Sequence, residues 1–133
     1  MLESKKPMRF KELPGLTVSV DSVTHEPHLN SDAARPHPFV YHLSIHNESE
    51  LPVTIFGRKW IVSDDHGGTL VVEGDGVVGQ TPRLEPGHSF SYNSYHVIKY
   101  PSTASGTFFG QTDDGTAVLV RVPDFTMAVQ QPG

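Results

Sequence analysis

Three glycines with the spacing of a phosphate-binding loop are the residues of this chain most suited to chemistry. They are Gly74, Gly76 and Gly79, in the segment EGDGVVGQTPRLEPG at positions 73–87. A G-x-G-x-x-G motif binds pyrophosphate when its last glycines open a helix, because the free N–H groups of the helix N-terminus point at the anion. Here Pro86 would lie inside such a helix and remove one of its hydrogen bonds. The sequence therefore disfavours a dinucleotide site.

Two interpretations of this loop remain. In the first, its glycines adopt positive φ angles in a tight connection that Val77 and Val78 anchor. In the second, the same backbone forms a nest for an anion such as a nucleotide or pyrophosphate, without a helix. We favour the first and keep the second open. The candidate ligand or partner contacts are the loop residues and two residues of an earlier segment: Gly74, Asp75, Gly76, Val77, Val78, Gly79, Arg58 and Trp60.

The other polar groupings predict no catalytic residue, metal site or cofactor. His42 and His46 would lie about 13 Å apart along one strand, too far to share a metal ion. His25, His28 and Asp32 offer a weak possibility of a divalent-ion site in a proline-containing loop, whereas Asp64-Asp65-His66 is typical of a turn. No nucleophile elbow accompanies the serine and histidine residues. We therefore predict that the protein is not an enzyme.

Composition narrows the class of protein further. The chain has 133 residues, no cysteine and a formal net charge of −5, which excludes thiol chemistry and disfavours binding to nucleic acid. The one local basic group, residues 5–11, is typical of a solvated terminus. No signal peptide and no apolar run of about 20 residues is present. We expect a soluble cytoplasmic protein without membrane contact.

The elements that must position the loop are strands, because prolines and glycines leave few uninterrupted windows that could hold a long helix. Between them, apolar residues alternate with period two. Seven runs show this pattern: 16–21, 39–46, 53–62, 69–72, 89–94, 106–110 and 116–122. Gly57 interrupts the third run and predicts a bulge there. Asp113-Asp114-Gly115 predicts a hairpin between the last two.

These strands predict an all-β fold, an immunoglobulin- or fibronectin-type-III-like antiparallel β-sandwich of about seven strands. We expect one domain over residues 1–133, with poorly ordered tails at 1–15 and 128–133 and a long loop from about Thr24 to Pro38. Trp60 is expected in the core between the sheets. The alternative is an exposed Trp60 beside Arg58, which would form a hot spot for a protein partner.

With these elements placed, the chain resembles the ApaG domain family over about residues 17–127. The segments that carry the resemblance are FVYHLSIHN (39–47), RKWIV (58–62), GDGVVG (74–79), PRLEPG (82–87) and VPDF (122–125). The resemblance implies a fibronectin-type-III-like sandwich without established catalytic residues. Bacterial members are small stand-alone proteins linked to cobalt resistance and magnesium efflux, and eukaryotic ones are appended to F-box and other proteins. Segments such as 95–100 and 109–112 depart from the family pattern.

We therefore expect a non-catalytic protein-interaction module. It would bind a protein partner through a sheet face or edge together with the Gly74–Gly79 loop, and edge pairing could also produce a homodimer. The alternative function is a small-molecule or anion sensor that uses the same loop.

Overall fold

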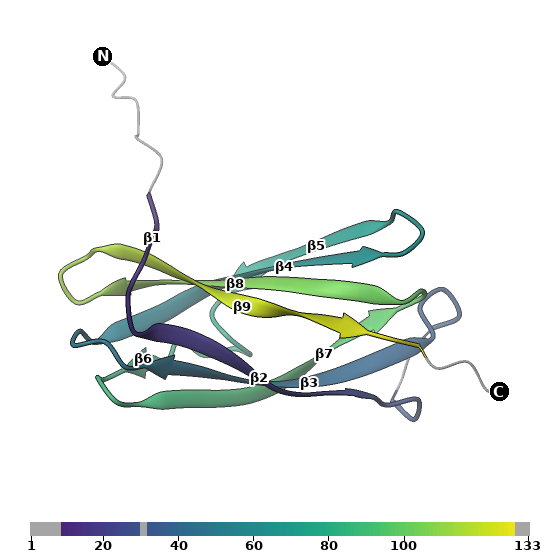
Figure 1. Cartoon of the computed structure of the whole chain (residues 1–133), viewed down its shortest axis with the longest axis horizontal. Helices are drawn as coiled ribbons and strands as arrows, with labels where there is room; N and C mark the ends of the chain where they lie inside the picture. The colour runs from purple at the N-terminus through teal and green to yellow at the C-terminus, as the bar shows by residue number, and fades with distance from the viewer. Residues whose placement is uncertain (1–8, 30–31, 130–133) are drawn as a thin grey trace, which may run out of the picture.

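The protein is a sandwich of two β-sheets (Figure 1). Its structure, a computed structural model, describes residues 9–29 and 32–129, and no helix occurs among them. The strands are β1 (Lys11–Glu12), β2 (Leu16–His25), β3 (His37–Asn47), β4 (Val53–Asp64), β5 (Thr69–Asp75), β6 (Arg83–Leu84), β7 (Ser89–Ile98), β8 (Ser102–Thr112) and β9 (Ala117–Met127).

The larger sheet has the order β1-β9-β8-β4-β5, with β6 paired to the start of β4, and the smaller sheet has the order β2-β3-β7. Every pairing is antiparallel except that of β1 with β9. This confirms the predicted antiparallel sandwich. The seven expected strands are the seven long ones, and the two-residue strands β1 and β6 are additions that period-two alternation cannot reveal.

The predicted hairpin and bulge are both confirmed. Gly115, with φ of 86°, turns the chain between β8 and β9, which pair along their length. In β4 the register against β8 shifts between Ile55 and Gly57. Before this bulge Val53 and Ile55 are buried in the core; after it Trp60 and Val62 are. The extra residue therefore moves the inward-facing positions of β4 from odd to even numbers.

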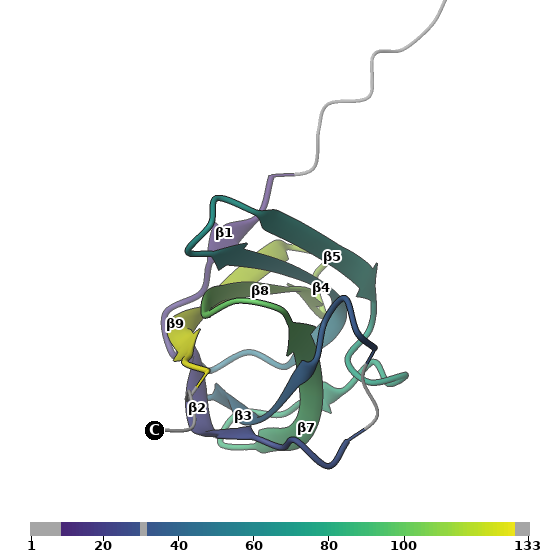
Figure 2. The same ribbon diagram turned by 90° about the vertical axis from the view of Figure 1, so that its right-hand side faces the viewer.

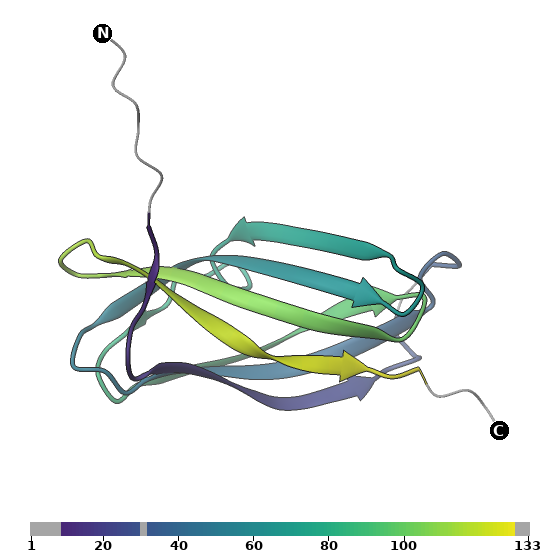
Figure 3. The same ribbon diagram turned by 45° about the horizontal axis from the view of Figure 1, so that its top comes forward.

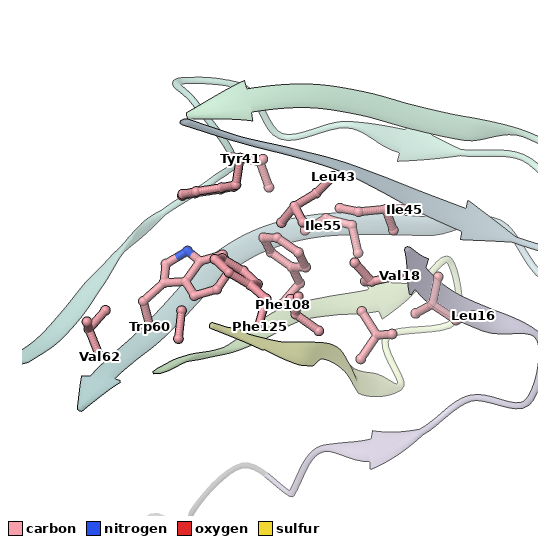
Figure 4. Packing of buried hydrophobic residues seen from close by; sticks show 14 of the residues in the cluster. Leu16, Val18, Tyr41, Leu43, Ile45, Ile55, Trp60, Val62, Phe108 and Phe125 are labelled. Atoms are coloured by element: carbon pink, nitrogen blue, oxygen red, sulfur yellow. The ribbon is translucent and has the colours of Figure 1, made fainter. Parts of the chain in front are cut away.

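Trp60 lies in the core, as the first interpretation expected, and is 2% exposed. Its ring centroid is 5.2 Å from that of Tyr41 on the opposite sheet and 5.8 Å from that of Phe125 (Figure 4). The alternative of an exposed Trp60 hot spot is therefore wrong, because the bulge turns this side chain inward. Gly106 lies opposite Trp60 on β8, where a Cβ atom would stand 2.6 Å from the indole ring.

The N-terminal part of the described chain is held by contacts with the larger sheet. Lys11 and Glu12 pair with β9 in parallel, and the ring of Phe10 lies 4.9 Å from that of Phe109. Part of the segment expected to be poorly ordered, residues 9–15, is thus attached to the sandwich. Residues 1–8 and 130–133 of the expected tails lie outside the described residues.

The two sheets differ in width, and this leaves one strand overhanging. The larger sheet is five strands across and the smaller is three. Seen end-on, β5 lies at the border of the upper layer and β7 at the border of the lower one (Figure 2). Figure 3 shows β5 along the outer edge of its sheet. Six of the seven residues of β5 are exposed.

Gly106→Ala is expected to destabilise the protein by about 1–3 kcal/mol, because the new methyl group must displace the Trp60 ring in a closely packed core. Chemical denaturation followed by Trp60 fluorescence measures this. Native emission from the parent protein should be blue-shifted and resistant to soluble quenchers. Ser105→Ala is the matched control, and equal stability of the two variants would contradict this account of the core.

Candidate functional site

The glycine loop ends in a tight turn directly after β5. Val77 and Gln80 exchange two backbone hydrogen bonds, of 2.7 and 3.0 Å. The two residues between them both have positive φ, 48° at Val78 and 78° at Gly79, which is the signature of a type I′ turn. Val77 is fully buried and fixes the turn against the core. This is the tight connection of the first interpretation.

Three of the N–H groups that could bind an anion are already donated to backbone carbonyl oxygens. Those of Val77 and Gln80 close the turn, and that of Gly76 donates to the carbonyl oxygen of Phe56 over 2.6 Å. A side chain at Gly76, whose φ is 65°, would collide with the carbonyl of Gln80. The glycine spacing is therefore explained by close backbone approach.

Arg58 joins the loop to β4. Its Nη1 donates to the carbonyl oxygens of Asp75 (2.7 Å) and Gly76 (3.1 Å). Its guanidinium group crosses Gly74, where a Cβ atom would stand 2.7 Å from Nη2. The structure thus brings Arg58 and the predicted loop residues together. Trp60, two residues along the same strand, lies behind them in the core.

Val78 is the strained residue of this loop. It is the one non-glycine residue with positive φ in the described chain, and its side chain is 53% exposed. A β-branched side chain disfavours this backbone conformation. An apolar side chain is therefore held out into solvent at a local energetic cost.

A groove opens beside the loop, between the border strands of the two sheets. Its volume is about 440 Å³, and Trp60 and Tyr41 contribute to its lining between the sheets. Leu70 and Val72 of β5 line one side, and Tyr95 of β7 lines the other. These three side chains are 44%, 36% and 58% exposed. The groove exists because the smaller sheet ends at β7 and leaves the inner face of β5 uncovered.

His96 lines this groove from β7. Its ring centroid lies 5.0 Å from that of Trp60 and 4.8 Å from that of Tyr41. Burial lowers the pKa of His96 to about 4, so the imidazole is neutral at pH 7. Its Nε2 is buried and has no hydrogen-bond partner among the described residues. The hydroxyl of Tyr92 is also buried and has no hydrogen-bond partner among the described residues. Burial raises the pKa of this phenol.

Polar residues on the outer face of the smaller sheet form a hydrogen-bonded network that does not have the arrangement of a catalytic triad. The Ser19 hydroxyl donates to Asp21 over 2.8 Å and contacts Nε2 of His46 over 2.9 Å. Asp21 thus contacts the serine and not the imidazole, which is the reverse of a Ser-His-Asp triad. Hydrogen bonds from Ser44 and Ser19 lower the pKa of Asp21.

The carboxylates near His66 stabilise a turn. The side chains of Asp64, Asp65 and His66 converge within 4.8 Å. The Asp64 carboxylate accepts the backbone N–H groups of His66 and Gly68, and the His66 ring stacks on Tyr100. These contacts are those of the turn that the sequence predicted.

Sequence reasoning missed the β5 edge and the groove. The signal was present in Leu70-Val71-Val72, three consecutive apolar residues in a strand whose neighbours alternate. Such a run requires burial on both faces or exposure of one. Alternation in the run 89–94 places Phe90 and Tyr92 on one face, but it does not specify that β7 borders the smaller sheet and that His96 lines a groove there.

Comparison with known proteins agrees with this architecture. The ApaG domain family model matches residues 27–112. Protein ApaG from Enterobacter sp. (strain 638) is 38% identical over 117 residues, which cover 87% of this chain and 93% of that protein. The crystal structure of the ApaA protein from Bordetella pertussis aligns with a TM-score of 0.78 and 30% identity, covering 93% of this chain and all of that one.

The fold and the turn-forming glycine loop define a small two-sheet β-sandwich protein. The chain belongs to the ApaG domain family. The names of these relatives state no catalytic activity. Within the described ranges, no helix has the length and apolar character needed to cross a bilayer.

Val78→Asn is expected to raise the free energy of unfolding by about 1 kcal/mol, because Asn-Gly is the preferred pair for a type I′ turn. Urea titration measures the change. Gly79→Ala, at a φ of 78° with open space around it, should lower stability by a similar amount. A destabilised Val78→Asn variant would show that the valine makes a contact worth more than its strain.

Stability should decline with acid because of His96. The folded pKa of about 4 lies below the ~6.5 of a free imidazole, so the unfolded chain takes up this proton at the higher pH. The free energy of unfolding should therefore fall between pH 6.5 and 4 by on the order of 3 kcal/mol from this group. Urea titrations across this range should show a shallower slope for His96→Phe, and parallel slopes would contradict the assignment.

Proposed function

We propose that this chain is a non-catalytic protein-interaction module that binds its partner along the outer edge of β5 and the adjoining glycine loop. The observation that carries this proposal is the exposed apolar edge strand itself. Leu70, Val71 and Val72 are consecutive and are 44%, 52% and 36% exposed. The unpaired backbone groups of an edge strand accept an added strand, and apolar side chains beside them strengthen such pairing.

Two of the other three borders of the sheets are less suited to this role. At the far border of the larger sheet, β1 pairs with Val118 and Leu119 of β9, and Pro123 interrupts the rest of that strand. In the smaller sheet β2 carries a register shift after Val20 and a polar outer face, both of which discourage edge pairing. At the border formed by β5, the Thr69–Val72 stretch carries no charge and no register shift, and Glu73 and Asp75 lie at its loop end.

The loop extends the surface beyond β5. Val78 presents an apolar side chain in a strained conformation, a combination that natural proteins retain at functional sites. Arg58 holds the loop in place through its two carbonyl contacts, so the surface is preorganised. These features support a contact with a macromolecule better than a phosphate site, because three loop N–H groups are already donated.

The link of the family to cobalt resistance and magnesium efflux would then operate through a cytoplasmic protein partner. Direct ion binding is less well supported, since the converging carboxylates at Asp64 and Asp65 stabilise a turn. Pairing of β5 with β5 of a second copy would give a homodimer and is a competing use of the same edge.

Val71→Lys tests the proposal, because a charge on this edge should abolish strand addition without disturbing the core. We expect affinity capture from the native host, quantified by mass spectrometry, to lose its specific partner with this variant. Thr17→Lys is the matched control, an exposed position on β2 at the opposite border. Equal capture by both variants, with unchanged melting temperatures, would contradict the proposed surface.

A further inference from the structure

We infer that the segment bound at this edge is an extended apolar peptide flanked by aspartate or glutamate residues, seated against the groove between β5 and β7. This inference rests on the proposed function and specifies the chemistry of the partner. It is carried by the shape of the groove and by the charges along it.

The groove is long enough for several residues of an extended chain. A second hollow of about 320 Å³ continues it beyond Val62 toward the end of β7. Leu70, Arg35 and Ile98 line both hollows. A peptide paired with β5 would point every second side chain over this surface. Leu70, Val72 and Tyr95 would receive apolar side chains at those positions.

Three basic residues along the groove lack ion-pair partners, and Asp64, a carboxylate in the lining, accepts the backbone N–H groups of His66 and Gly68. Arg58 lies at the end near the loop, Lys99 at the opposite end and Arg35 between them. None of the three forms an ion pair within the described chain. Several cations elsewhere are neutralised by carboxylates: Lys59 by Glu73, Arg83 by Glu85 and Asp113, and Arg121 by Glu12. On a chain of net charge −5, this leaves a local basic border around an apolar groove.

Basic residues that border an apolar groove favour an apolar ligand with acidic flanks. Such a ligand would pair with these cations in a partly desolvated setting and would approach faster through long-range attraction. The buried Nε2 of His96 adds an unpaired polar atom in the groove lining.

A second copy of this chain fits the groove less well. Antiparallel pairing of β5 with another β5 would keep each inner face on the same side. The second strand would then present its own Leu70 and Val72 to the groove, while Glu73 and Asp75 would face outward with Val71. The carboxylates of the second β5 would therefore face away from the groove. Charge complementarity therefore favours a foreign segment.

Phage display of random 12-residue peptides against the immobilised full chain tests this inference. We expect the enriched peptides to combine alternating Val, Ile or Leu residues with flanking Asp or Glu. Fluorescence anisotropy of the most enriched peptide should show about a tenfold loss of affinity in Arg35→Gln/Lys99→Gln. Arg9→Gln/Lys11→Gln, with the same change of charge at the opposite border, should bind as the parent does.

The possible results distinguish the acidic peptide, a second copy of the chain and the β5 surface itself. Enriched peptides that lack acidic residues, or that bind the Arg35→Gln/Lys99→Gln variant with unchanged affinity, would contradict the acidic flanks of the proposed ligand. They would not contradict binding at the β5 surface. A dimer that is seen in analytical ultracentrifugation and that Val71→Lys dissociates would contradict a foreign peptide as the occupant. The occupant would then be a second copy of this chain. Absence of any enriched peptide, or binding that Val71→Lys leaves unchanged, would overturn the proposed surface as well.

Discussion

The bulge in β4 is the constraint on which the arrangement of this sandwich depends. One extra residue, Phe56 between Ile55 and Gly57, moves the inward-facing positions of the strand, so that Trp60 enters the core and Arg58 lies beneath the glycine loop. Without that shift Val62 and Trp60 would face solvent, and Lys59 and Ile61 would face the opposite sheet. The aromatic core, the position of the loop and the groove beside it therefore all depend on this one bulge.

The unequal width of the sheets is the second organising feature. A three-stranded layer cannot cover a five-stranded one, and the uncovered strand is β5. Its apolar residues and the hollow beneath them follow from this mismatch. The glycine loop ends the same strand, so the motif that suggests phosphate chemistry in sequence serves in the fold to close and brace an exposed edge.

Sequence patterning specified the long strands, the bulge and the hairpin, because each depends on residues close together in the chain. Alternation placed Tyr41, Leu43 and Ile45 in the core, and the lone glycine in β4 indicated the register shift. The strand order, which brings β5 beside β7, depends on contacts between distant segments that no local pattern records. The exposure of Leu70 and the burial of His96 follow from that order, and neither could be assigned beforehand.

The pairing of β1 with β9 has a consequence for how such a domain can be combined with others. Both described ends of the chain, at β1 and just after β9, lie toward the border of the sandwich opposite β5. A polypeptide fused at either end would leave from that far side. The β5 edge, where we propose that a partner binds, would then face away from the attachment.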